Sequence, residues 1–275
     1  MLELVGERTP VRGLVKDFWA HRDLLFMLAR QDYRSRYRSA SLGLVWAIFL
    51  PLLQGIVIAI VFTHLTGGGK TSSFLPYVIG GVTAFGFVSS SLNAASTAIV
   101  DNGAIAGRLY FPRLVLPTIT PTANLPGLVI GLTIALGIGI GAGARPGFWV
   151  LLLPAGIALM WLLVVSAGAL LTMLHVYSRD VRYIVQAVML ILFYATPVIY
   201  RLDGTKGAIA LPDGLVPLVL ANPVTGVVQT IRLALIGDAA YVGPAVAVTC
   251  AWVAVLSVAT LFVYARFERV ACDRL

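Results

Sequence analysis

Residues 148–176 read FWVLLLPAGIALMWLLVVSAGALLTMLHV and contain no Asp, Glu, Lys or Arg. A helix needs about 20 mostly apolar residues to cross a hydrocarbon core about 30 Å thick, so this stretch is long enough to span a membrane. The same search on either side finds further charge-free stretches at 45–65, 74–100, 118–142, 183–200 and 243–265. The sequence therefore predicts an all-α integral membrane protein with six transmembrane helices.

The overall composition excludes an ordinary soluble domain. Hydrophobic residues make up 59% of the chain and charged residues only 12%, and the mean hydropathy is +0.92. Soluble domains carry about 25% charged residues. A membrane protein is the class that fits.

The basic residues predict the orientation. Segments 1–44, 101–117, 177–182 and 266–275 hold all but five of the 20 Lys and Arg. With six spans these segments share one side, and the positive-inside rule makes that side cytoplasmic. We expect a multi-pass membrane protein with both termini cytoplasmic. The net charge of +8 then reflects a basic collar facing anionic headgroups and needs no nucleic acid.

A seventh apolar stretch, 215–236, is interrupted by Asn222-Pro223 and carries Arg232. Proline and a charge both disfavour a single crossing helix. We predict short re-entrant helices on the outer side, between spans five and six.

Residues 12–38 place Leu14, Phe18, Leu25 and Leu28 near one face at helical spacing. This pattern predicts an amphipathic helix in the inner membrane surface, and a solvated cytoplasmic helix is the alternative. An inner-surface basic cluster ends the segment, and it either anchors the chain by snorkelling or grips a partner or an anionic lipid head. Its residues are Arg34, Arg36, Tyr37 and Arg38.

The predicted cytoplasmic loop 101–117 reads DNGAIAGRLYFPRLVLP. It predicts a brief helix that ends at Pro112, with an apolar and aromatic knob facing the cytoplasm. Exposed apolar residues on such a loop indicate a partner surface.

Two groups of residues within the spans have two interpretations each. The hydroxyl and amide residues of 89–97 either let helices pack closely or line a hydrated path. Phe193, Tyr194 and Tyr200 either form an interfacial belt or offer faces over which a sugar slides.

Chemistry for self-powered transport is missing from the predicted spans. All 12 Asp and Glu lie outside them, which excludes an intramembrane ion-coupling centre and acid–base catalysis there. The three His are far apart in the predicted topology, so no metal site is expected. Residues 67–71, GGGKT, lack the first glycine of a phosphate-binding loop. We expect a non-catalytic membrane subunit driven by an energised cytoplasmic partner.

Several short stretches, taken in order, resemble the membrane subunit of ABC-2 type exporters, specifically those that move polysaccharides such as O-antigen, teichoic acid or cell-wall galactan. The resemblance covers nearly the whole chain. The stretches are Arg22-Asp23-Leu24-Leu25, Arg36-Tyr37-Arg38-Ser39, Leu42-Gly43 with Trp46, Pro51-Leu52-Leu53, Asn102 with Phe111-Pro112-Arg113, Arg179-Asp180, Thr196-Pro197-Val198-Ile199-Tyr200 and Asn222-Pro223.

This resemblance implies a single ABC-2 type transmembrane domain over 1–275, with the amphipathic helix at 12–38, six spans within 45–265 and a cytoplasmic tail at 266–275. It implies a homodimer bound to two copies of a cytoplasmic ABC ATPase, which would bind the ATP and Mg, leaving this chain without a cofactor. The cargo would be a lipid-linked polysaccharide. Competing interpretations are a drug or small-lipid exporter of the same superfamily, a membrane enzyme acting on a lipid-linked glycan, and a structural assembly subunit.

The same resemblance assigns roles to individual residues. Path candidates from spans one and five are Trp46, Phe49, Phe193, Tyr194 and Tyr200. Candidates for coupling to the ATPase are Asn102, Ile105, Arg108, Tyr110, Phe111, Pro112 and Arg113. The segment with Asn222, Pro223 and Arg232 would cap the outer side.

Overall fold

The computed structural model describes residues 11–38, 45–66, 71–103, 111–202 and 213–272, and within these ranges every regular element is a helix. In chain order the elements are α1 (Val11–Ala20), α2 (Arg22–Arg38), α3 (Val45–Thr66), α4 (Thr71–Ala95), α5 (Ala98–Asp101), α7 (Val115–Gly141), η1 (Gly147–Leu152), α8 (Leu153–Tyr177), α9 (Val181–Ala195), η2 (Asp213–Leu215), α10 (Val216–Ala221), α11 (Pro223–Ile236) and α12 (Val242–Cys272).

Four helical stretches are long and apolar enough to cross a membrane: Phe74–Ala95, Val115–Gly141, Gly147–Tyr177 and Val242–Arg266. They confirm the second, third, fourth and sixth predicted spans. The first and fifth predictions fall on shorter apolar stretches, Phe49–His64 in α3 and Val181–Ala195. The protein is a multi-pass helical membrane protein, and the count of six stays a prediction.

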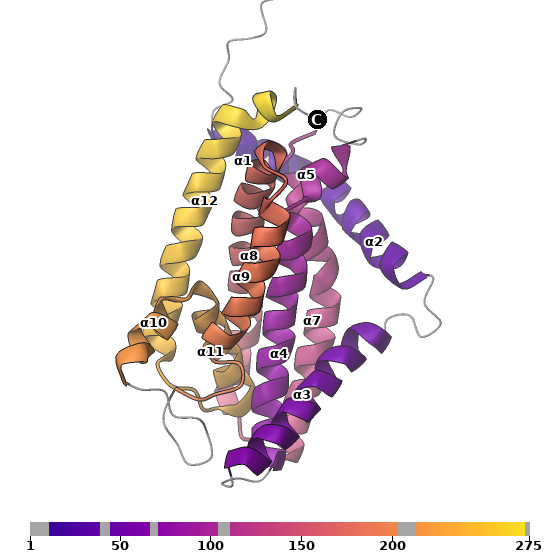
Figure 1. The fold of residues 1–275 in the computed structure, drawn as a ribbon. Coiled ribbons are helices and arrows are strands. Elements are labelled where there is room, and N and C mark those ends of the chain that lie inside the picture. The colour runs from indigo at the N-terminus through magenta and orange to yellow at the C-terminus, as the bar shows by residue number, and fades with distance from the viewer. Residues whose placement is uncertain (1–10, 39–44, 67–70, 104–110, 203–212, 273–275) are drawn as a thin grey trace, which may run out of the picture.

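Helix α4 occupies the centre of the bundle (Figure 1) and packs against α3, α7, α8, α9 and α11. In its apolar window 78% of the residues are buried, against 33%, 22% and 11% in the other three. Small residues of α4 allow neighbouring helices to approach closely; at Gly80, for example, a Cβ would overlap Leu235 Cδ1 of α11. Ser91 and Ser96 are fully buried, so part of the polar run serves packing.

The two ends of the molecule differ. Helices α1 and α5 and the C-terminal end of α12 lie at one end, which we call the basic end, and α10 and α11 lie at the opposite end (Figure 1). The predicted amphipathic helix is broken at His21 into α1 and α2. Leu14 and Leu25 on its apolar face are buried in a cluster with Phe111 and Tyr264. That face therefore packs on protein, while Trp19 and Phe26 remain exposed.

The fifth predicted span is shorter than expected. Helix α9 ends at Ala195, and Thr196 is extended with ψ 139°. Pro197 follows directly, and proline disfavours helix for the residue before it. Residues 196–200 form a turn rather than the last turn of a helix.

The segment 215–236 is divided at Asn222 into α10 and α11, which agrees with the predicted division into short helices. Asn222 caps α11, because its side-chain oxygen accepts a 2.9 Å hydrogen bond from the Val224 backbone N–H. Gly226 lets α11 approach α12 closely: a Cβ there would overlap Ala245 O and Thr249 Oγ1. Their re-entry into the membrane stays a prediction.

Candidate functional site

A groove of about 520 Å³ lies between α3, α4 and α9. Amide and hydroxyl groups line it together with apolar and aromatic side chains, and no lining residue carries a charge. Its lining consists of Gln54, Val82, Phe85, Gly86, Ser89, Ser90, Asn93, Gln186, Met189, Leu190, Phe193 and Tyr194. Such a lining suits a polar but neutral chain.

Helical spacing brings the polar groups into the groove. Ser89 and Asn93 are four residues apart on α4, so they lie on one face, and the Asn93 Nδ2 donates a 2.8 Å hydrogen bond to Ser89 O. Gln186 and Phe193 are seven residues apart on α9, which is two turns. Gln54 and Gln186 form no side-chain hydrogen bond with any described residue, so both amides are available to a ligand.

The two aromatic residues near the end of α9 lie in different surroundings. The Phe193 ring packs edge-on against Phe85 of α4, with centroids 5.3 Å apart. Tyr194 meets Phe193 at 5.3 Å and 87°, and 62% of its surface is exposed. Phe193 is thus a packing residue as well as a wall, whereas Tyr194 is free to contact a passing molecule.

The other path candidates lie elsewhere. Trp46 and Phe49, near the start of α3, contact each other at 5.9 Å and are both exposed, but neither lines the groove. Tyr200 is 9% exposed. Its hydroxyl donates to Ala195 O at 3.2 Å, and its backbone oxygen accepts a 2.6 Å hydrogen bond from the Tyr77 hydroxyl. Tyr200 therefore holds the turn after α9 in place.

The coupling candidates are only partly described, since Ile105, Arg108 and Tyr110 lie outside the described residues. Phe111 is 8% exposed and belongs to the buried cluster with Leu14 and Tyr264. It fills space between helices at the basic end and does not form an exposed knob. Pro112 and Arg113 are half-buried. Asn102 is also half-buried, and its side chain donates a 2.9 Å hydrogen bond to Ala98 O.

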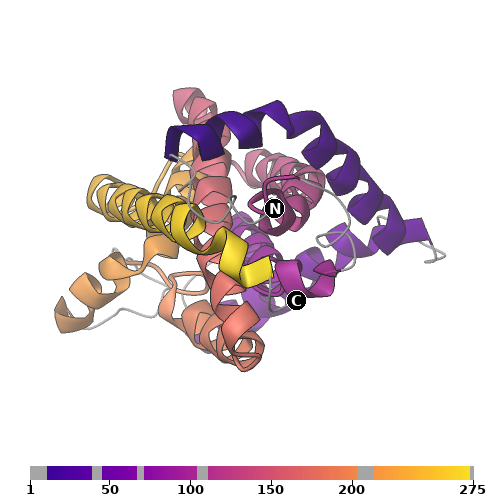
Figure 2. The same cartoon turned by 90° about the horizontal axis from the view of Figure 1, so that it is seen from above.

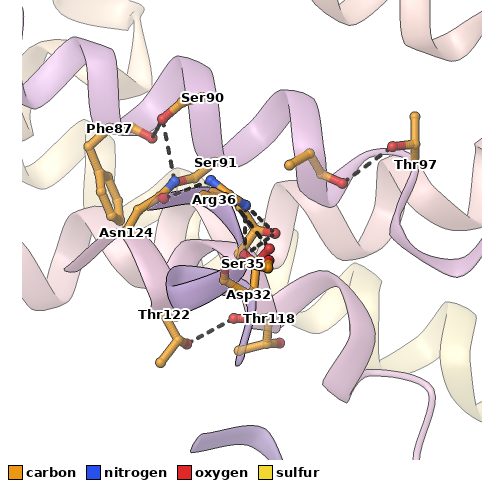
Figure 3. A network of polar contacts seen from close by, with 12 residues as sticks. Asp32, Ser35, Arg36, Phe87, Ser90, Ser91, Thr97, Thr118, Thr122 and Asn124 are labelled. Carbon is orange, nitrogen blue, oxygen red and sulfur yellow. Dashed lines mark hydrogen bonds and ion pairs between the residues drawn. The ribbon is translucent and has the colours of Figure 1, made fainter. Parts of the chain in front are cut away.

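Arg36 of the basic cluster faces the protein (Figure 3). It forms an ion pair with Asp32 at 2.7 Å and donates hydrogen bonds to Asn124 Oδ1 at 3.0 Å and Thr120 Oγ1 at 3.1 Å. Asn124 in turn donates to Ser91 Oγ at 2.8 Å. This network joins α2, α7 and α4. Arg34 is exposed, while the side chains of Tyr37 and Arg38 lie outside the described part.

At the opposite end, the Asn222 Nδ2 donates to Thr196 Oγ1 at 2.8 Å, tying α11 to the end of α9. Pro223 occupies the first turn of α11. Arg232 is fully buried and donates to Val198 O at 2.8 Å and to Gln229 Oε1 at 3.2 Å. Arg232 thus fixes α11 to the turn after α9.

Sequence reasoning did not single out Gln54, Gln186, Asp32 or Asn124. The sequence does mark Gln54 and Gln186, since each is an amide side chain within a largely apolar helix. Nothing local marks the Arg36–Asn124 contact, because the two residues are 88 positions apart.

Comparison with known proteins assigns the chain. The ABC-2 type transporter family matches residues 23–236. The chain is similar to the O-antigen export system permease protein RfbA of Myxococcus xanthus, with 29% identity over 190 residues, covering 69% of this chain and 73% of the relative. It is also similar to the protein of the same name from Klebsiella pneumoniae, with 21% identity over 211 residues, covering 76% of this chain and 79% of the relative. The family match spans well over half of the residues, and this chain belongs to the ABC-2 type transporter family as a membrane permease.

Proposed function

We propose that this permease moves a lipid-linked polysaccharide of the O-antigen, teichoic acid or galactan type across the bacterial cytoplasmic membrane, driven by ATP hydrolysis on a partner. The observation that carries the proposal is the lining of the α3–α4–α9 groove, which combines neutral amides and hydroxyls with aromatic faces. A sugar polymer presents hydroxyls and apolar ring faces in alternation, so both kinds of wall group serve it. The two relatives are O-antigen export permeases by name, which supports a polysaccharide cargo.

The groove is open along its length in a single chain, so a closed path needs a second wall. Helices α3 and α9 present large exposed apolar residues beside it, among them Leu50, Val57, Ile184 and Ile191. A second copy of the chain covers these faces in our proposal and completes the passage between two α3–α9 pairs. In that arrangement α3 and α9 also cross the bilayer, which gives six spans.

In this proposal the basic end and both termini face the cytoplasm. The energy of ATP hydrolysis is transmitted to the permease at that end. Two ATPase subunits bind ATP and Mg there and dock on α1, α2 and the segment 101–113. The buried cluster of Leu14, Phe111 and Tyr264 joins that segment to α1 and α12. Closure of the ATPases would therefore shift several helices together.

Depletion of the chain in its native bacterium tests the function. We expect the lipid-linked glycan to accumulate on the cytoplasmic side while surface glycan falls. Unchanged surface glycan together with an altered sensitivity to drugs or a changed lipid distribution would instead establish a drug or small-lipid exporter. A co-purified ATPase whose turnover rises when this chain is present would support the coupling proposal, and turnover independent of the chain would contradict it.

A further inference from the structure

A separate cavity of about 300 Å³ lies between α2, α3, α4 and α7. It shares Gly86 and Ser90 with the α3–α4–α9 groove, so the two spaces meet along one surface of α4. Its lining residues are Tyr33, Arg36, Trp46, Leu50, Pro51, Thr83, Gly86, Phe87, Ser90, Ala123, Asn124, Gly127 and Leu128. The volume lies at the lower end of the range for small-molecule sites.

One part of the cavity wall is aromatic. Trp46 of α3 is 41% exposed, whereas Phe87 of α4 is buried at 5%. Trp46 is held edge-on by Phe49, with centroids 5.9 Å apart. An indole held in this way offers a broad apolar face, which is what the C–H face of a sugar ring packs against.

Another part of the wall is a fixed polar network (Figure 3). Arg36 donates a 3.0 Å hydrogen bond to Asn124 Oδ1. The Asn124 Nδ2 in turn donates a 3.4 Å hydrogen bond to Ser90 Oγ. Asp32 balances the charge of Arg36 through the 2.7 Å ion pair. The network is therefore neutral overall, which favours a neutral hydroxylated ligand over a phosphate group.

Thr83 gives independent evidence for a ligand. The residue is 7% exposed, it lines the cavity, and its hydroxyl has no hydrogen-bond partner among the described residues. A buried hydroxyl without a partner costs about 1–3 kcal/mol, and a rotation of this side chain toward the cavity would let a ligand hydroxyl remove that cost. Gly86 and Gly127 add space, since a Cβ at either would meet nothing within 4 Å.

We propose that this cavity binds one neutral pyranose ring of the transported glycan, with the ring face on Trp46 and ring hydroxyls on Thr83, Ser90 and Asn124. It deepens the proposed function, on which it rests, by assigning a sugar-recognition site beside the path. Gly86 and Ser90 line both the cavity and the groove. A sugar ring bound in the cavity therefore lies beside the neighbouring ring of the same glycan in the groove.

Saturation-transfer NMR of the purified chain in nanodiscs tests the binding, with methyl galactoside, mannoside and rhamnoside as probes and inorganic pyrophosphate as the competitor. We expect transfer to at least one pyranoside. Thr83→Val should weaken it about five-fold, as expected for one lost neutral hydrogen bond, and Gly127→Leu should abolish it by filling the cavity. Thr133→Val and Gly137→Leu are the matched controls on α7: Thr133 bonds its own helix at Val129 O, and a Cβ at Gly137 meets open space.

Transfer to no pyranoside, equal transfer in Gly127→Leu and Gly137→Leu, or displacement of the sugar by pyrophosphate would overturn the inference. Glycan export in cells separates it from the proposed function. If depletion of the chain causes accumulation of the glycan but Gly127→Leu and Gly137→Leu export at equal rates, the cavity is not a sugar site and the permease function stands. If depletion leaves the glycan unaffected, the proposed function itself is wrong.

Discussion

The guanidinium carbon of Arg232 lies 3.5 Å from the centroid of the Tyr77 ring. Arg232 belongs to α11 and Tyr77 to α4, and the Tyr77 hydroxyl continues the contact to Tyr200 O in the turn after α9. Gly81 makes room for this arrangement, because a Cβ there would lie 3.0 Å from Arg232 Nη2. One buried cation thus joins three segments at the end of the molecule opposite α1.

Arg232→Gln should destabilise the chain by roughly 3 kcal/mol, because it removes a desolvated cation–π contact and a charge-assisted hydrogen bond to Val198 O. The melting temperature of the purified protein measures the loss. Arg22→Gln is the control, since Arg22 pairs with Asp23 at 3.9 Å with both side chains exposed and such pairs contribute about 0–1 kcal/mol. Equal losses in the two variants would contradict the special role of Arg232.

Asn222 has two functions that substitution can separate. Asn222→Ala should lower the melting temperature most, because it removes the α11 cap, worth about 1 kcal/mol, and leaves the Thr196 hydroxyl buried without its donor. Asn222→Ser keeps a capping oxygen but does not reach Thr196, so we expect an intermediate value. An Asn222→Ser protein as unstable as Asn222→Ala would show that the cap contributes nothing.

Gly226→Ala should separate α11 from α12, because the added methyl group overlaps Ala245 O and Thr249 Oγ1. We expect a large drop in the yield of folded protein from the membrane, measured by size-exclusion chromatography. Gly243→Ala makes the same chemical change on α12, where the new methyl group meets nothing within 4 Å. The Gly243→Ala protein should fold normally or be slightly stabilised, since alanine favours helix over glycine. An equal drop in folded yield for both variants would show that the close approach of α11 and α12 is not the cause.

Phe111→Ala should lower stability by about 3–5 kcal/mol, the usual cost of deleting a buried aromatic ring. Its effect on export would then follow from reduced folding, which differs from the role expected from the loop sequence. Asn102→Ala is the cleaner probe of coupling, because Asn102 is half-buried and its side chain donates to Ala98 O of the neighbouring helical turn. The measurements are melting temperature and stimulated ATPase turnover, and a stable Phe111→Ala protein with reduced turnover would restore the direct coupling role.

Tyr194→Ala should slow glycan export several-fold without lowering the yield of dimer, because the side chain is 62% exposed and contributes little to folding. Tyr183→Ala is the matched control: it lies on the same helix, is 68% exposed and does not line the groove. The rate at which glycan appears at the cell surface is the readout. Equal export by the two variants, or a parallel loss of dimer in Tyr194→Ala, would favour a packing role.

Apolar length without charge was sufficient to predict α4, α7, α8 and α12, because a bilayer imposes that pattern on any helix that crosses it. Apolar length alone overran the end of α9, where Pro197 ends the helix and Tyr200 and Arg232 hold the turn that follows. For α1 and α2, helical periodicity predicted a position in the membrane surface, whereas Leu14 and Leu25 on the apolar face are buried against other helices. The periodicity of Leu14 and Leu25 reveals that one face is buried, but not whether lipid or protein covers it.

The candidate site was partly predictable. The sequence marks Phe193 and Tyr194 as aromatic residues in a largely apolar helix, and it offers the hydroxyl run of α4 as one of two groups that could line a path. The cavity beside α3 was not foreseen, because its walls come from Arg36, Thr83 and Asn124 on three different helices. Only the packing of α2 against α7 brings those groups together.

The brevity of α9 has a mechanical consequence for the surrounding bilayer. Its 15 residues rise about 22 Å, whereas a hydrocarbon core is about 30 Å thick. In the proposed arrangement, in which α9 crosses the bilayer, the lipid beside it thins to match the helix, at a cost of a fraction of a kcal/mol per ångström of mismatch. The thinnest part of the membrane would then lie beside the wall that the sugar chain follows in the proposed passage, before any ATP is bound.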